Sequence, residues 1–272
     1  MISVERKIEK IKKKEKETTG LAKKELEILV LLYKFRFLNR LHIQKMLRHK
    51  YHGQIQIWLN NLVEKDCLTK DYEKKFAGSA AIYHLTPSSR KYLKDQPHVK
   101  PQLLDRRVWR EKDRTKEFKD HCLFLADTHI SLQGFTDKAN STLYYFAKTD
   151  LWGRDYVLEP KPDAYFAIFT ERGNVKRYFL DLFDEIPPRA MRARVNQYLK
   201  YYEDDTWYEK YPDKPFPAII FICPHKRIKG HLYHYIQDQL CYPELEFYLT
   251  TKEIIRKKGL VRESLDKVKD EI

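Results

Sequence analysis

The chain has 272 residues, 42% of them hydrophobic, which is enough to form the core of one large domain or two small ones. Its formal net charge of +14 favours a polyanionic partner such as nucleic acid, with an acidic membrane surface as the rival. A run of 18 apolar residues and an apolar N-terminal segment are both missing, which argues against a spanning helix and a secretory signal, so we expect a cytoplasmic protein that does not bind membranes.

The first elements are helical. Residues 1–18 mix Lys with Glu and form either a basic arm that lies along phosphates or a solubilising leader. Apolar residues at helical spacing then predict a helix that starts near Thr19, a short helix over residues 39–47 with Asn39 as its N-cap, and a third helix over residues 51–68. Val63 is expected on the buried stripe of the third helix.

A hairpin follows these helices. Two short strands flank a Gly-Ser turn within residues 69–86, and a further helix starts at Thr86 as cap with Pro87 at its first position. Three helices followed by a hairpin predict a winged helix-turn-helix over residues 19–95. The segment "IYHLTPSSRKYL" also resembles the one that closes the wing in many bacterial winged-helix proteins. The alternative is a winged helix that contacts another protein.

In such a module the third helix enters the major groove of double-stranded DNA. Asn and Gln can pair with adenine, and Lys and Arg contact phosphates, so a cluster of such residues favours DNA binding over an ordinary solvated helix face. Sequence-specific and shape-based binding both stay open. The candidate DNA contacts in this module are Lys45, Arg48, Lys50, His52, Gln54, Gln56, Asn60, Asn61, Lys74 and Lys75.

Residues 96–118 are predicted to form a linker helix. Pro97 and Pro101 interrupt the preceding helix, and charge density then rises. A row of arginines at helical spacing could form a phosphate-binding ridge, or simply the solvated face of an interdomain helix. The arginines of this row are Arg106, Arg107, Arg110 and Arg114, the first three of which join the candidate DNA contacts.

The second half, residues 119–250, alternates helices with strands. The stretch "FPAIIFICP" is the most apolar of the chain and predicts a central strand buried on both sides. Residues 251–272 are expected to be a charged helical tail. The whole chain is therefore predicted to be α+β, with an α/β sandwich after the winged helix-turn-helix. Tyrosines interleaved with Lys and Arg could stack on unpaired bases, although most are expected in the core.

Two aspartates are expected at the ends of adjacent strands. Asp163 opens the strand over residues 163–170, and Asp181 lies inside the strand over residues 177–184. Across a hairpin their carboxylates can converge on one divalent cation, and oxygen ligands suit Mg²⁺ or Mn²⁺. Asp163 and Asp181 are therefore candidate metal ligands and candidate catalytic residues.

This layout resembles the PD-(D/E)XK nuclease superfamily, which implies a nuclease-like core in the α/β sandwich. The usual lysine, two residues past the second carboxylate, is replaced by Phe183. The next helix could supply a cation instead, and Lys200 is placed in the candidate catalytic set, with Arg194 and Arg189 as alternatives. Glu159, Asp155 and Glu203 are candidates for a further ligand.

The two halves together resemble the replication-relaxation family. The motifs are the winged helix, "HCLFLADTHISL", "PDAYFAI", "YFLDLFD" and "QYLKYYE". This resemblance implies a DNA-binding protein of a plasmid or other mobile element, acting in replication, copy control or DNA relaxation and mobilisation. The family's acidic strand carries a glutamate, one spacer and an aspartate, whereas this chain has Asp181 and Phe183, so the nuclease-like core is expected to be degenerate.

No catalysis is expected from such a core, and no cofactor unless the site is active, in which case Mg²⁺ or Mn²⁺ is expected. The alternative functions are a metal-dependent DNA endonuclease that uses Asp163 and Asp181, and an adaptor that contacts proteins. The expected partners are double-stranded DNA, a second copy of the chain, and replication or mobilisation proteins.

Overall fold

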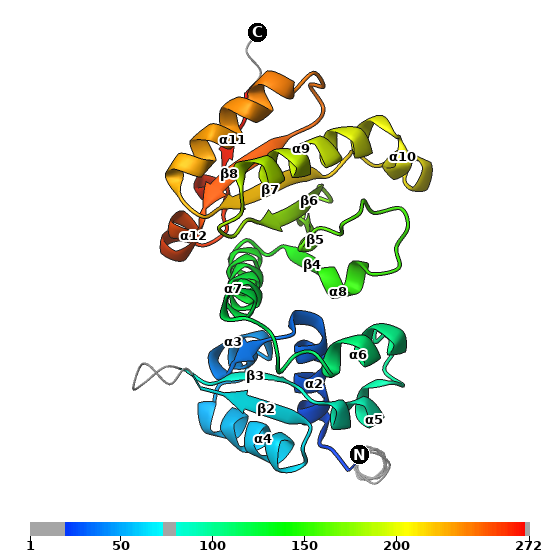
Figure 1. The fold of residues 1–272 in the computed structure, drawn as a ribbon, viewed down its shortest axis with the longest axis vertical. Coiled ribbons are helices and arrows are strands. Elements are labelled where there is room, and N and C mark those ends of the chain that lie inside the picture. The colour runs from blue at the N-terminus through cyan, green and yellow to red at the C-terminus, as the bar shows by residue number, and fades with distance from the viewer. Residues whose placement is uncertain (1–19, 73–79, 270–272) are drawn as a thin grey trace. The chain divides into compact units, whose positions relative to one another are not determined.

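The computed structural model describes residues 20–72 and 80–269 (Figure 1). The fold is α+β, as predicted, and divides into two units, Met1–Leu123 and Phe124–Ile272. The expected arm of residues 1–18, together with Lys74 and Lys75, lies outside the described residues. Across residues 20–72 and 80–269, no helix combines the length and the apolar character needed to cross a membrane.

The first unit begins with helices α2, α3 and α4 and contains a three-stranded antiparallel sheet in the order β1-β3-β2. Asn39 is the N-cap of the second helix, as predicted, because its side chain accepts a 2.9 Å hydrogen bond from the backbone N–H of His42. The elements are α2 (Lys23–Phe35), β1 (Leu38–Asn39), α3 (Arg40–Met46), α4 (His52–Glu64), β2 (Leu68–Asp71) and β3 (Ile82–Leu85).

Apolar residues at helical spacing form the core of this unit. Ile28 and Leu32 of α2 and Ile55 and Leu59 of α4 are fully buried, which is the pattern that an amphipathic helix shows against its neighbours. Val63 was expected on the same stripe but is only half-buried. The inner stripe of α4 therefore consists of Ile55, Leu59 and Leu62.

The segment after β3 packs against this unit. Thr86 is the N-cap and Pro87 the first residue, as predicted, but they begin a 3-10 turn (Pro87–Ser89) before α5 (Arg90–Leu93). The side chain of Thr86 donates to the backbone carbonyl of Asp66. The predicted linker contains α6 (Pro101–Val108), which buries Leu103, Leu104 and Val108. Apolar burial of this kind fixes α6 within the first unit.

The predicted arginine ridge is not one helix face. Helix α6 ends at Val108, so Arg110 and Arg114 lie beyond the helix that carries Arg106 and Arg107. Glu111 lies in this following turn and forms a bidentate ion pair with Arg36, with both N–O distances at 2.8 Å. This pair fixes the turn to the end of α2.

A six-stranded mixed sheet, in the order β4-β5-β6-β7-β8-β9, forms the second unit. Strands β4 to β6 pair antiparallel, β6, β7 and β8 pair parallel, and β9 pairs antiparallel with β8. The strands are β4 (Thr142–Ala147), β5 (Ala164–Phe169), β6 (Val175–Leu182), β7 (Ala218–Cys223), β8 (Phe247–Thr251) and β9 (Asp266–Lys267). The predicted central strand is confirmed, because β7 lies between two parallel neighbours with Ile219 to Cys223 buried.

Helices cover both faces of this sheet (Figure 1). On one face, Tyr198 of α9 and Ile236 of α11 are buried with Phe179, Phe221 and Phe247 of three neighbouring strands. On the other face, the ring of His129 of α7 packs edge to face against Tyr145 of β4, with centroids 4.8 Å apart. The helices of this unit are α7 (Lys116–Lys138), which crosses the boundary between the units, α8 (Lys148–Leu151), α9 (Pro188–Glu203), α10 (Thr206–Lys210), α11 (Lys226–Gln239) and α12 (Lys252–Lys258).

The last residues depart from the predicted charged tail. Helix α12 occupies the start of this segment, as expected, but the chain then returns and adds β9 to the sheet. Val268, just after β9, is buried in the main core cluster. The tail is therefore part of the second unit's architecture.

The cysteines give a direct check of this packing. Cys67, Cys122 and Cys223 are buried and Cys241 is exposed. Burial raises the pKa of Cys67, and it raises that of Cys223 to about 12, so little reactive thiolate forms at either.

We expect iodoacetamide to modify only Cys241 in the native protein and all four cysteines after denaturation, as read by mass spectrometry. Modification of Cys223 at the rate of Cys241 would contradict the fold.

Candidate nucleic-acid interface and carboxylate site

The turn between α3 and α4 is held by side chains. The amide of Gln44 donates to the carbonyls of His49 and Lys50, at 3.2 and 3.4 Å. The ring of His49 accepts from the backbone N–H of Tyr51 and packs edge-on against Trp58, with centroids 5.0 Å apart. These contacts fix where α4 begins relative to α3.

The polar residues predicted to face DNA lie on different sides of α4. His52 and Asn60 are exposed, and Gln54 and Gln56 are half-buried. The amide of Gln56 donates to Asn60 Oδ1 at 2.9 Å, so these two side chains act together. The amide of Asn61 instead donates to Glu25 Oε1 at 3.1 Å. The expectation of one shared outward face is therefore wrong for Asn61, which ties α4 to α2.

Two exposed apolar side chains near this helix were not among the predicted contacts. Tyr51, at the N-cap of α4, is 64% exposed, and Ile57 is 52% exposed. Apolar side chains can contact the methyl group of thymine in the major groove. The sequence alone does not distinguish Ile57 from the buried residues of α4, because an apolar pattern does not show which apolar side chain of a helix remains exposed.

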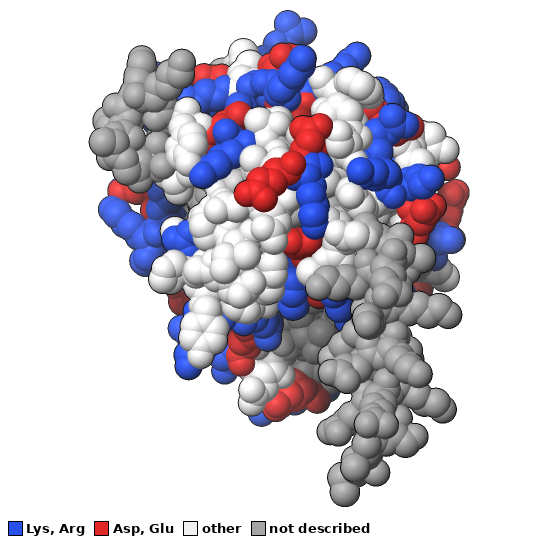
Figure 2. Space-filling model, turned by 90° about the horizontal axis from the view of Figure 1, so that it is seen from below, with Lys and Arg blue, Asp and Glu red and all other residues white. Residues whose placement is uncertain are grey.

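The predicted phosphate contacts are mostly accessible. Lys45, Arg48 and Lys50 are exposed around the α3–α4 turn, as are Arg106 and Arg110. The exception among the described residues is Arg107, which is half-buried. Its burial and the nearby Arg36 lower its pKa to about 10. Figure 2 shows Lys and Arg side chains spread over one face of the molecule, with Asp and Glu among them and broad uncharged areas between.

The net charge is confined to one unit. Residues 1–123 carry 30 Lys and Arg against 16 Asp and Glu, a net charge of +14, whereas residues 124–272 carry 23 of each. A polyanion is therefore attracted to the first unit far more than to the second.

In the second unit, Asp163 and Asp181 come together at one end of the β5–β6 hairpin. The last register pair is Ala164 with Leu180, so the two aspartates follow as the next opposed positions. Asp163 is only 7% exposed and Asp181 only 6%. The sequence prediction that these two carboxylates share one strand end agrees with this register.

Both oxygens of Asp181 accept hydrogen bonds from α9. Arg194 donates from Nε to Oδ2 at 2.8 Å and from Nη2 to Oδ1 at 3.2 Å, and the hydroxyl of Tyr198 donates to Oδ2 at 2.7 Å. Arg194 also donates from Nη1 to the carbonyl of Pro160 at 2.7 Å. This bidentate, charge-assisted geometry is the strong form of an ion pair.

Asp163 has different partners. Lys148, the first residue of α8, places Nζ 3.2 Å from Oδ1, and the backbone N–H of Leu182 donates to Oδ2 at 3.0 Å. Sequence reasoning missed Lys148. Its signal would have been the register, because Ala147 pairs with Ala164 and so brings the residue after β4 to Asp163.

Burial shapes the charges in this cluster. It would lower the pKa of Arg194, but the charge of Asp181 outweighs it and keeps that pKa raised, so the guanidinium stays protonated. Burial and then Asp181 raise the pKa of Tyr198 well above its ordinary value, so its hydroxyl stays a donor. The negative charge of Asp181 is therefore neutralised within the protein.

This arrangement does not fit Mg²⁺ or Mn²⁺. Each carboxylate oxygen of the pair already accepts a hydrogen bond, and across residues 20–72 and 80–269 no three His, Cys, Asp or Glu side chains group as a metal site. Of the further candidates, Glu159 pairs with Lys161, Glu203 accepts from Tyr242, and Asp155 is exposed.

The position of the missing lysine is part of the core. Phe183 is buried and stacks on Phe221, with ring centroids 5.0 Å apart. Lys200 is exposed on α9, whereas the buried side of the same helix presents Arg194 and Tyr198 to Asp181. Of the cations suggested for this role, the structure brings Arg194 to the carboxylates and leaves Lys200 outside.

Removing one partner of the buried pair should be costly. We expect Arg194→Met to lower the free energy of unfolding by about 3–5 kcal/mol, because it leaves Asp181 buried and charged without its partner. The double variant Asp181→Leu, Arg194→Met should recover much of this loss. Arg189→Met, an exposed change in the first turn of α9, should change stability by less than about 0.5 kcal/mol. Urea denaturation measures all three, and equal stability of Arg194→Met and wild type would contradict the pairing.

Comparison with known proteins identifies one family. The family described as Replication-relaxation matches residues 29–217, more than two thirds of the chain. A search of curated proteins finds no match. A search of solved structures finds none either. The matched region starts in α2, includes α4 and both aspartates, and ends just before β7. The chain therefore belongs to the replication-relaxation family.

Proposed function

We propose that this chain is a DNA-binding protein of a plasmid or other mobile element, acting in replication, copy control or DNA relaxation and mobilisation. Membership of the replication-relaxation family supports the cellular process. The observation that carries DNA binding is the charge division, because residues 1–123 hold the whole net charge of +14. Phosphate contacts by Lys and Arg supply most of the affinity in such complexes.

In this proposal residues 19–95 act as a winged helix-turn-helix. The order of α2, α3, α4 and the β2–β3 hairpin supports that assignment, as does the pinned turn between α3 and α4. Helix α4 lies in the major groove, where His52, Gln56 and Asn60 reach base edges. Lys45, Arg48 and Lys50 lie beside the groove and contact phosphates.

The second unit serves as a degenerate PD-(D/E)XK nuclease-like core. The strand order and the opposed Asp163 and Asp181 support the likeness, and the Arg194 pairing argues for a structural role of these carboxylates. Because the net charge of residues 124–272 is zero, assembly suits this unit better than a general grip on duplex DNA. Its partners would be a second copy of the chain or replication and mobilisation proteins.

Salt dependence tests the DNA-binding proposal. We expect the affinity for labelled duplex DNA to fall steeply with salt, and the double variant Lys45→Gln, Arg48→Gln to reduce the slope of log K against log salt by about 2, roughly 1 per phosphate contact. Arg172→Gln, an exposed change in the β5–β6 turn, is the matched control and should keep the wild-type slope. Fluorescence anisotropy at several salt concentrations provides the measurement.

A flat slope together with tight binding to a protein would replace this proposal with the adaptor function. Selecting bound DNA from a random pool would then separate sequence-specific from shape-based binding. A recurring motif in the selected pool indicates base contacts by α4, and a pool without one indicates recognition of shape and charge.

The second candidate is a metal-dependent endonuclease, favoured by one observation: Lys148 lies beside Asp163 and could replace the missing lysine. Arg194 would first have to leave Asp181. We expect supercoiled plasmid incubated with the protein and Mg²⁺ or Mn²⁺ to stay supercoiled on an agarose gel, because Asp181 is already neutralised. Nicking that disappears in Asp163→Ala would establish the endonuclease instead.

A further inference from the structure

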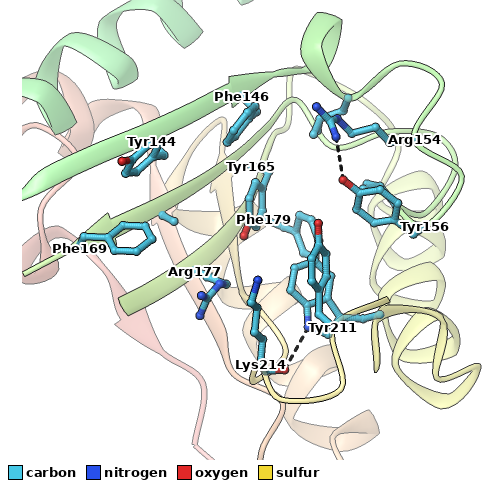
Figure 3. Close-up of a pocket in the computed structure, with 14 residues that line it drawn as sticks. Tyr144, Phe146, Arg154, Tyr156, Tyr165, Phe169, Arg177, Phe179, Tyr211 and Lys214 are labelled. Atoms are coloured by element: carbon cyan, nitrogen blue, oxygen red, sulfur yellow. Dashed lines mark hydrogen bonds between the residues drawn. The ribbon is translucent and has the colours of Figure 1, made fainter. Parts of the chain in front are cut away.

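A pocket of about 260 Å³ opens on the second unit, and neither Asp163 nor Asp181 lines it (Figure 3). Its floor is one face of β4, β5 and β6. The register aligns Tyr144, Ala167 and Arg177 across these three strands. Because Ala167 has only a methyl group between two long side chains, the floor is hollow at this point. The pocket is slightly smaller than the ~300–1,000 Å³ typical of small-molecule sites, which suits a single ring system.

Aromatic rings surround this hollow. The next row across the same strands is Phe146, Tyr165 and Phe179. A wall comes from α10 and its neighbours, where the rings of Trp207 and Tyr211 have centroids 4.8 Å apart. Figure 3 shows Tyr144 and Phe169 on one side of the pocket, Tyr156 and Tyr211 on the other, and Arg177 and Lys214 between them.

The charges of the pocket are all positive. Arg154, Arg177 and Lys214 line it, and none of the described lining residues is Asp or Glu. Arg154 is held by the hydroxyl of Tyr156 at 2.9 Å and the carbonyl of Asp150 at 3.1 Å, and Lys214 Nζ lies 4.4 Å from the ring centre of Tyr211. In a unit whose net charge is zero, three cations around one aromatic hollow are complementary to an anionic ligand with a flat ring.

The tyrosine hydroxyls add donors. Burial raises the pKa of Tyr165, and burial with a hydrogen bond to Tyr156 raises that of Tyr211 to about 12. Both hydroxyls therefore stay protonated at neutral pH. They can donate to a phosphate or a base carbonyl without repelling its charge.

We propose that this aromatic pocket binds one unpaired nucleotide of single-stranded DNA. The base stacks between the rings, and the phosphate meets Arg177 and Lys214. Stacking on aromatic side chains requires a base whose face is free, which duplex DNA does not offer. This site goes beyond the proposed duplex binding by residues 1–123 and uses none of its residues.

The surroundings of the pocket favour a strand over a free nucleotide. Tyr144 is 51% exposed and Phe169 is 38% exposed, and their rings lie edge to face with centroids 5.0 Å apart. They continue the aromatic surface out of the hollow, where the next base of the same strand can stack. A free nucleotide would leave these two rings without a stacked base.

The test uses the full chain with labelled oligothymidylate, labelled duplex DNA and the mononucleotide dTMP. Ala167→Met fills the hollow, and Arg177→Gln removes a cation at the half-buried rim. We expect each to weaken binding of the single strand about tenfold or more and to leave duplex affinity unchanged, as measured by anisotropy. Lys258→Gln, an exposed change on α12, is the matched control and should bind both DNAs as the wild type does.

A second readout places the effect in the pocket. Unlabelled oligothymidylate should quench tryptophan fluorescence, and Trp207→Phe should remove most of that change. The proposal is overturned if both pocket variants bind the single strand as tightly as wild type, if they lose single-strand and duplex affinity by the same factor, or if dTMP binds as tightly as the strand. Because the duplex is measured separately, loss of duplex binding with intact pocket dependence would overturn only the function proposed for residues 1–123.

Discussion

The ion pair between Arg194 and Asp181 is the interaction on which the second unit depends. It joins α9 to β6 inside the protein, with both residues less than a tenth exposed. Taking two charges out of water is costly, and only good geometry offsets that cost. Here two N–H···O bonds, the Tyr198 hydroxyl and the Pro160 carbonyl satisfy the buried groups. The pair thereby sets the position of α9 against the sheet, and the aromatic core forms around it.

The charge division separates two tasks that a basic protein often combines. Under the functions proposed above, the first unit attracts a polyanion by its net charge, whereas the neutral second unit discriminates by local features such as the aromatic pocket. Because the second unit has no net charge, it attracts polyanions only weakly at long range, and its contacts depend on shape and on short-range complementarity. These two proposals together assign duplex DNA to one unit and a different partner to the other.

Much of the fold could be predicted from local patterns. Asn39 caps α3, the apolar run of β7 is a central strand, and the hairpin of β5 and β6 follows its turn residues, because each of these depends on neighbours in sequence. The inward turn of Asn61 depends on buried Glu25, thirty-six residues away, and no local pattern reports it. The two prolines and the rising charge of residues 96–118 predict a linker, although Leu103 and Leu104 of α6 are buried.

The carboxylate site shows the same limit. The two aspartates could be predicted because they sit on one hairpin, whose register follows from the turn. The choice between Lys200 and Arg194 could not, since it depends on which side of α9 faces the sheet. The contact of Lys148 with Asp163 could not be predicted from the sequence either, because it requires the pairing of β4 with β5.

Strand β9 has a practical consequence for handling the protein. It covers the outer side of β8, pairing Tyr248 with Lys267 and Leu249 with Asp266. A chain cut after α12 would expose the backbone N–H and C=O groups of β8 as an open edge, which recruits strands from other molecules. Expression boundaries and affinity tags for crystallisation therefore belong beyond Lys269, because a shorter product would tend to aggregate even though every helix remained.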